Sequence, residues 1–154
     1  MIDTPQMVQT TVVATAIIRL AIPREQIRTV MGPGLGELMA ALRDQGIAAA
    51  GPWFTHHLRR DPATFDFEIC VPVTRPVAPV GRVTPGQLPT AKVARTVYHG
   101  PYEALGAAWM EFDAWIAAQG RRPAPDLWEV YLTDPQANPD PTTWRTELNR
   151  PLAG

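Results

Sequence analysis

The sequence predicts an α+β domain of two strand-helix-strand-strand repeats, with pseudo-twofold symmetry around a central cleft. Its 154 residues, 45% hydrophobic and 19% charged, suit one globular domain. Segments rich in β-branched residues alternate with segments of helical periodicity, and the order strand, helix, strand, strand occurs twice. We therefore expect a single domain over residues 1–154, with a first half at about 8–73, a connector at 74–90 and a second half at about 91–152.

The first half begins with a predicted strand over Thr10–Leu20, a stretch rich in β-branched residues. Pro23 suits the first position of a helix. The segment MGPGLG (31–36) interrupts the helical pattern, which predicts a short helix over 24–31 and a main helix over 35–45. The apolar face of the main helix is formed by Leu35, Leu38, Met39 and Leu42.

Gly46 is placed to cap this helix, and two strands follow at PWFTHHLR (52–59) and TFDFEICVPV (64–73). The second of these strands alternates apolar and polar residues, which is typical of a half-buried strand. The proline-rich stretch that follows, residues 74–90, is expected to be a surface connector.

The second half repeats this plan, with strands expected at 91–100, 127–135 and 144–152. The segment 100–120 between the first two is the strongest helix pattern in the chain, with Pro101 near its start and Gly120 just past its end. Its apolar stripe consists of Leu105, Trp109, Phe112 and Ile116.

Short matches connect the halves. FEICVPV and TELNRPL each place a glutamate four residues before a proline, at Glu68 and Glu147. PWFTHHL and DLWEVYL each carry a tryptophan after the glycine that ends the helix, at Trp53 and Trp128. Together with the repeated order of elements, these matches favour two similar units.

The composition excludes several classes of function. A net charge of -1 does not favour nucleic acid or an anionic membrane as a partner, and no apolar run approaches the ~18 residues of a membrane span. The first ten residues do not resemble a signal peptide, so we expect a cytoplasmic protein. The single cysteine, Cys70, excludes an intrachain disulfide, and three histidines without an acidic ligand pattern predict no metal site. GPGLG lacks the lysine of a P-loop, and we expect no cofactor.

Glu129 is the candidate functional residue in the run DLWEVYLTDP. Because side chains alternate along a strand, Trp128, Val130 and Leu132 share one face, and Glu129 and Tyr131 share the other. We expect the apolar triplet to pack on the helices and Glu129 to line a groove. An unpaired carboxylate in a groove is costly, and either a cationic ligand or a structural donor such as arginine or tyrosine would relieve that cost. The alternative is that Glu129 faces solvent on an open sheet.

The second half resembles the GyrI-like small-molecule-binding domain, the effector-binding domain of AraC-type and multidrug-sensing regulators. The resemblance rests on YHGPYEALGAAW (98–109), on W-E-x-Y-L-T-D-P (128–135) and on TELNRPL (146–152). It implies two repeated units around a central cleft, with Glu129 in the cleft contacting lipophilic compounds, including cationic ones. The chain has no helix-turn-helix segment or basic face, so we expect no direct binding of nucleic acid.

Further residues are candidates for the same site. If Trp53 corresponds to Trp128, Phe54 matches Glu129 and His56 matches Tyr131, so both could line a second wall of the groove. An exposed or hydrogen-bonded histidine is the alternative for His56. The remaining candidates are Trp109, whose other role is core packing, and Tyr102, whose other role is to cap the helix.

Three functions are compatible with these residues and with what the resemblance implies, since similar free-standing proteins include a gyrase modulator and hydrolases that open cyclopropane rings. The first is a free-standing module that binds lipophilic small molecules, cationic ones included, through aromatic rings and Glu129. The second is a hydrolase, in which Glu129 activates water and Tyr131 donates a proton to open an electrophilic ring such as a cyclopropane. The third is a protein-interaction module that modulates an enzyme such as gyrase. The sequence leaves open a protein partner or a homodimer.

Overall fold

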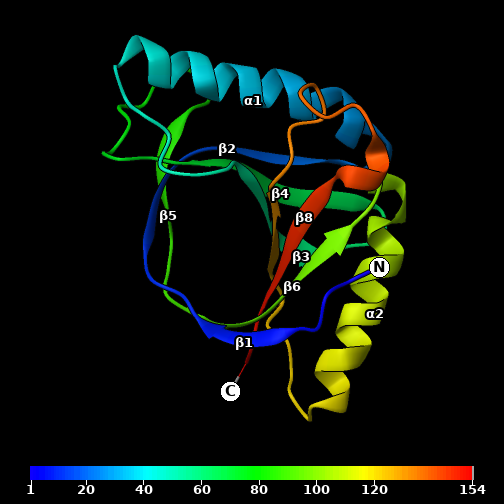
Figure 1. Ribbon diagram of the computed structural model, residues 1–154. Coiled ribbons are helices and arrows are strands. Elements are labelled where there is room, and N and C mark those ends of the chain that lie inside the picture. Colours follow the sequence, from blue (N-terminus) through cyan, green and yellow to red (C-terminus); the bar gives the residue numbers. More distant parts are fainter. Residues whose placement is uncertain (154) are drawn as a thin grey trace. The chain divides into compact units, whose positions relative to one another are not determined.

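The computed structural model describes residues 1–153, except for the side chains of Arg28 and Arg60. The described residues form eight strands and two α-helices, which confirms a mixed α and β fold (Figure 1). The chain divides into two compact units. The N-terminal unit is Thr11–Thr90, and the C-terminal unit combines Met1–Thr10 with the chain from Ala91 onward. Gly154, the expected last residue of the domain, lies outside the described residues.

The N-terminal unit contains four antiparallel strands in the order β3-β4-β2-β5. Their bounds are β2 Val13–Pro23, β3 Phe54–Arg60, β4 Thr64–Pro72 and β5 Thr84–Leu88. Strand β5 was not predicted, because it lies within the proline-rich stretch expected to be a connector. Its Pro85 is tolerated because β5 is the last strand of this order, where a missing backbone N–H does not interrupt a central ladder.

Helix α1 runs without interruption over Ile27–Asp44, after a 3-10 turn at Arg24–Gln26. The prediction of two separate helices was therefore wrong. Gly34 explains the difference, because it is buried and a Cβ at this position would lie 2.5 Å from Cδ1 of Ile69. The glycine allows α1 to approach strand β4 closely, and it does not end the helix.

The end of α1 was predicted correctly. Gly46 adopts a φ of 66°, and its backbone N–H donates to the carbonyl of Arg43. Ile47 donates to the carbonyl of Leu42, so the last carbonyls of the helix are satisfied. Of the expected apolar face, Leu38 and Leu42 are fully buried, whereas Met39 is 46% exposed and does not join the core.

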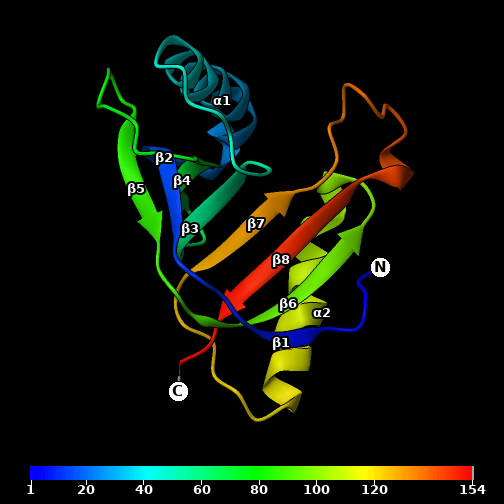
Figure 2. The same ribbon diagram turned by 60° about the vertical axis from the view of Figure 1, so that its left-hand side comes forward.

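The C-terminal unit also contains four antiparallel strands, in the order β1-β6-β8-β7 (Figure 2). Their bounds are β1 Gln6–Gln9, β6 Lys92–His99, β7 Leu127–Tyr131 and β8 Arg145–Pro151. Helix α2 covers Leu105–Ala118 and follows a 3-10 turn at Tyr102–Ala104. Gly120, with a φ of 70°, follows the end of α2 as predicted.

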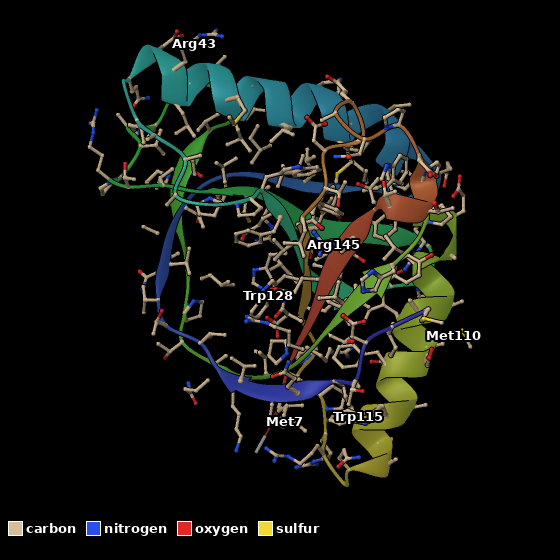
Figure 3. All side chains as sticks on the ribbon, viewed as in Figure 1. Met7, Arg43, Met110, Trp115, Trp128 and Arg145 are labelled. Carbon is tan, nitrogen blue, oxygen red and sulfur yellow. The ribbon has the colours of Figure 1, made fainter. Side chains whose placement is uncertain are left out.

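The predicted stripe of α2 forms the core of the C-terminal unit. Trp109, Phe112 and Ile116 are buried against Leu127 of β7 and Leu148 of β8, with Leu105 partly buried beside them. Met110, on the opposite side of the helix, is 75% exposed and points away from the strands (Figure 3). Burial of this stripe fixes which face of the strands α2 covers.

Two glycines of α1 provide a matched test of this packing. Gly34→Ala should destabilise the protein relative to Gly36→Ala, whose Cβ would meet nothing within 4 Å. Both substitutions gain about 1 kcal/mol of helix propensity, but overpacking at Gly34 costs ~1–3 kcal/mol. Urea denaturation of both variants measures the difference directly. Equal stability would show that the side chain of Ile69 moves aside without cost.

Candidate functional site

Glu129 lies on the face of β7 that α2 covers. Leu127, two residues earlier and therefore on the same face, packs in the core cluster with the helix. The expectation that Trp128, Val130 and Leu132 pack on the helices was wrong. Trp128 is buried on the opposite face, and Leu132 lies beyond the end of the strand and is 38% exposed. Both faces of β7 carry apolar residues, so alternation alone could not identify the one that faces the helix.

Two neutral donors bind the half-buried carboxylate of Glu129. The indole Nε1 of Trp109 donates to Oε2 at 2.6 Å, and the hydroxyl of Tyr131 donates to Oε1 at 2.8 Å. Among the described side chains, no cation forms a salt bridge with Glu129. The carboxylate is therefore held in place by neutral hydrogen-bond donors, and no cationic side chain among the described residues compensates it.

Aromatic rings continue outward from this carboxylate. The ring of Tyr102 meets that of Tyr131 edge-on, with centroids 5.9 Å apart, and lies 4.8 Å from the ring of Trp144. Trp144 is fixed in turn by its indole N–H, which donates to the carbonyl of Asn138 at 2.6 Å. Residues of α2, the 3-10 turn before it, β7 and the loop before β8 thus form one aromatic site beside Glu129.

The electrostatic field at Tyr102 reflects the negative charge of this site. Burial raises the pKa of the Tyr102 phenol, and the carboxylates of Asp134 and Glu129 raise it further. Each carboxylate opposes the phenolate charge, so the phenol keeps its proton to higher pH than usual. The same field attracts a cation.

Of the six predicted site residues, the structure brings four together: Glu129, its two donors Trp109 and Tyr131, and Tyr102, whose ring contacts that of Tyr131. Sequence reasoning missed Trp144 and Asp134. The signal that could have found Trp144 is an aromatic residue directly before the last predicted strand.

Phe54 and His56 belong to the N-terminal unit, and a role opposite Glu129 stays a prediction. Phe54 is 4% exposed and pairs with Cys70 across β3 and β4. Nδ1 of His56 lies 3.6 Å from Oε1 of Glu68, within the range of an ion pair. Burial raises the pKa of the Cys70 thiol, which makes it a weak nucleophile.

The strand registers change the expected correspondence between β3 and β7. Phe54 pairs with Cys70, two residues after Glu68, and Trp128 pairs with Asn149, two residues after Glu147. By this register Phe54 corresponds to Trp128. The sequence comparison had matched Trp53 with Trp128, which is one residue too early in the chain.

Thr55 then takes the register position of Glu129, and His57 that of Tyr131. Nε2 of His57 lies 3.1 Å from the hydroxyl of Thr55, and its ring stacks on Phe67 at 5.3 Å. The N-terminal unit therefore has no carboxylate at this position of β3.

Most of the chain matches a known protein family. Residues 32–153 match the GyrI-like small molecule binding domain. The chain belongs to the GyrI-like family. This confirms the resemblance that its motifs indicated, and it identifies the chain as a small-molecule-binding domain. A comparison with curated proteins found no match.

Solved structures share the fold. The C-terminal domain of EcmrR has a TM-score of 0.86 at 19% identity, over 97% of both chains. In a complex of EcmrR with DNA, this chain covers 57% of the EcmrR chain, with a TM-score of 0.85 at 18% identity. SAV2435 bound to tetraphenylphosphonium has a TM-score of 0.73 at 13% identity, over 99% of this chain and 95% of the other.

A hydrolase from Listeria innocua has a TM-score of 0.68 at 12% identity, over 97% of this chain and 91% of the other. At these identities the likenesses establish the fold alone. In the part of the chain that the structure describes, no helix is long and apolar enough to cross a bilayer, and no three potential metal ligands cluster.

A double-mutant cycle can test the hydrogen bond between Tyr131 and Glu129. Tyr131→Phe should destabilise the protein by about 1.5–3 kcal/mol, because it removes a donor to a charged acceptor. The same substitution should cost about 1 kcal/mol in a Glu129→Gln background, where the acceptor is neutral. Chemical denaturation of the four proteins gives the coupling. A coupling energy near zero would contradict a stabilising bond.

Titration of Tyr102 can test the field of the site. Asp134→Asn should lower the pKa of Tyr102 toward its usual value, because it removes an opposing charge, and Glu129→Gln should lower it less. Ultraviolet absorbance against pH follows the phenolate, with Tyr102→Phe to identify its signal. If both variants leave the titration unchanged, these carboxylates do not act on the phenol.

Proposed function

We propose that this protein binds lipophilic cations at Glu129. The observation that carries the proposal is the carboxylate held by two neutral donors, Trp109 and Tyr131, with the rings of Tyr102 and Trp144 extending outward from Tyr131. Aromatic rings supply apolar contact area, and their faces attract a cation. The carboxylate supplies the charge that a neutral aromatic site lacks.

The physical gain comes from the partly buried charge. A carboxylate removed from water loses solvation, which two neutral hydrogen bonds replace only in part. A cation that reaches Glu129 compensates this charge. The cost of removing the cation itself from water is small only if the cation is weakly hydrated. Such a ligand has its charge spread over a large apolar body, as in a quaternary phosphonium or ammonium compound.

Two comparisons support this ligand class. The chain belongs to a family of small-molecule-binding domains, and SAV2435, which shares its fold, binds tetraphenylphosphonium. EcmrR, which shares the fold in its C-terminal domain, forms a complex with DNA. We therefore propose that residues 1–154 act as one domain that senses small molecules. We also propose that its two units are repeats of one strand-helix-strand-strand arrangement.

A hydrolase is the second candidate, favoured by the Tyr131–Glu129 pair and by the hydrolase from Listeria innocua that shares the fold. The sequence suggested a water between the two polar groups, but their oxygens lie 2.8 Å apart in a direct hydrogen bond. A nucleophilic water would first have to displace the tyrosine hydroxyl from the carboxylate. A bound cation would displace the same hydroxyl, so the preference for binding rests on the uncompensated charge of Glu129 and on the aromatic rings beside it.

Two ions of nearly the same shape and opposite charge test the proposal. Wild-type protein should bind tetraphenylphosphonium more tightly than tetraphenylborate. Glu129→Gln should weaken phosphonium binding by about 10- to 150-fold, since a hydrogen-bonded charge contact contributes ~1.5–3 kcal/mol. Borate binding should stay equal or improve. Isothermal titration calorimetry measures both affinities.

The matched control is Glu111→Gln, which removes the same charge from the exposed side of α2. It should leave both affinities within about twofold, because an exposed charge is screened by solvent. Equal losses for the two ions in Glu129→Gln would show that the carboxylate does not select for charge, and the proposal would fail.

A further inference from the structure

Thr146 lies in the same part of the C-terminal unit as Glu129. It pairs directly with Tyr98 on one side and with Tyr131 on the other, so these three side chains form one row across β6, β8 and β7. Leu148, two residues further along β8, pairs with Glu129 and packs beneath α2. Thr146 therefore shares the helix-covered face with Glu129 and lies diagonally across from it.

The hydroxyl of Thr146 has no hydrogen-bond partner among the described residues, although the residue is 0% exposed. A buried hydroxyl without a partner is destabilising, because it has lost its bonds to water and gained none in the protein. Valine has nearly the same shape and would avoid this loss. A threonine at this position is thus less favourable than a valine would be.

Neighbouring hydroxyls show that this is a local exception. Tyr98 donates to the carbonyl of Pro101 at 2.8 Å, and Tyr131 donates to Glu129. Thr96, two residues before Tyr98 on the same face, donates to the carbonyl of Asp3 at 2.7 Å. Each of these donors has its acceptor within the protein, whereas the Thr146 hydroxyl has none in the part of the chain that the structure describes.

We propose that the Thr146 hydroxyl binds the ligand of the Glu129 site by donating a hydrogen bond to an oxygen acceptor. This inference rests on the proposed function and narrows its ligand class to lipophilic cations that carry an ether or carbonyl oxygen. The ligand's cation replaces the Tyr131 hydroxyl at Glu129 and displaces the neighbouring ring of Tyr131 from its place beside Thr146. Diagonal neighbours in a sheet have their side chains roughly 7–8 Å apart, a separation that one substituted aryl ring can span.

Two phosphonium cations of matched size test the proposal. (4-Methoxyphenyl)triphenylphosphonium carries an ether oxygen, and (4-ethylphenyl)triphenylphosphonium replaces it with a methylene group. Wild-type protein should bind the methoxy compound about 3- to 10-fold more tightly, the effect of one hydrogen bond. Thr146→Val should abolish this preference and leave the affinity for the ethyl compound unchanged, and Thr146→Ser should retain the preference.

Thr96→Val is the matched control, because its hydroxyl already has an acceptor in the protein. It should lower the midpoint of urea denaturation and keep the methoxy preference, whereas Thr146→Val should raise the midpoint. Circular dichroism of each variant confirms that it is folded. The role of Thr146 is refuted if wild-type protein binds both compounds equally well. It is also refuted if Thr146→Val still prefers the methoxy compound. In either case the proposed function stands. If wild type binds neither compound nor tetraphenylphosphonium, the proposed function itself is refuted.

Discussion

The hydrogen bond from the indole of Trp109 to the carboxylate of Glu129 is the interaction on which the site depends. It joins the core stripe of α2 to strand β7 at 2.6 Å, so the residue that packs the core also orients the charged group. Trp109 is 6% exposed, and its ring cannot shift without disturbing Phe112 beside it. The position of the carboxylate is therefore as well determined as the core itself.

The kind of donor matters as much as its position. An arginine beside Glu129 would neutralise the carboxylate and leave little attraction for a charged ligand. Indole and phenol groups stabilise the same carboxylate through hydrogen bonds but add no positive charge. Elsewhere in the C-terminal unit, Glu147 contacts Arg95 and Asp113 contacts Arg150, so those carboxylates are compensated in the ordinary way. Glu129 differs from them in keeping its charge available.

Much of the fold could be predicted because it depends on local sequence patterns. The apolar stripe of α2, the alternation in β4 and the cap at Gly46 depend on residues close in the chain. The continuity of α1 could not be predicted, because Gly34 serves a contact with Ile69, a residue distant in sequence. Strand β5 was missed for a similar reason, since pairing with β2 outweighs a proline-rich composition with poor strand propensity.

For the site, the sequence by itself determined the residue types: a glutamate and a tyrosine two apart on a strand, and a tryptophan within a helical stripe. Motif spacing also determined the family. The tertiary structure decided which face of β7 turns toward α2, because Trp128 and Leu127 are both apolar and only packing against the helix selects one parity. It also decided that the Thr146 hydroxyl has no acceptor among the described residues. Hydrogen bonding of a buried group depends on neighbours from other strands, which no local pattern specifies.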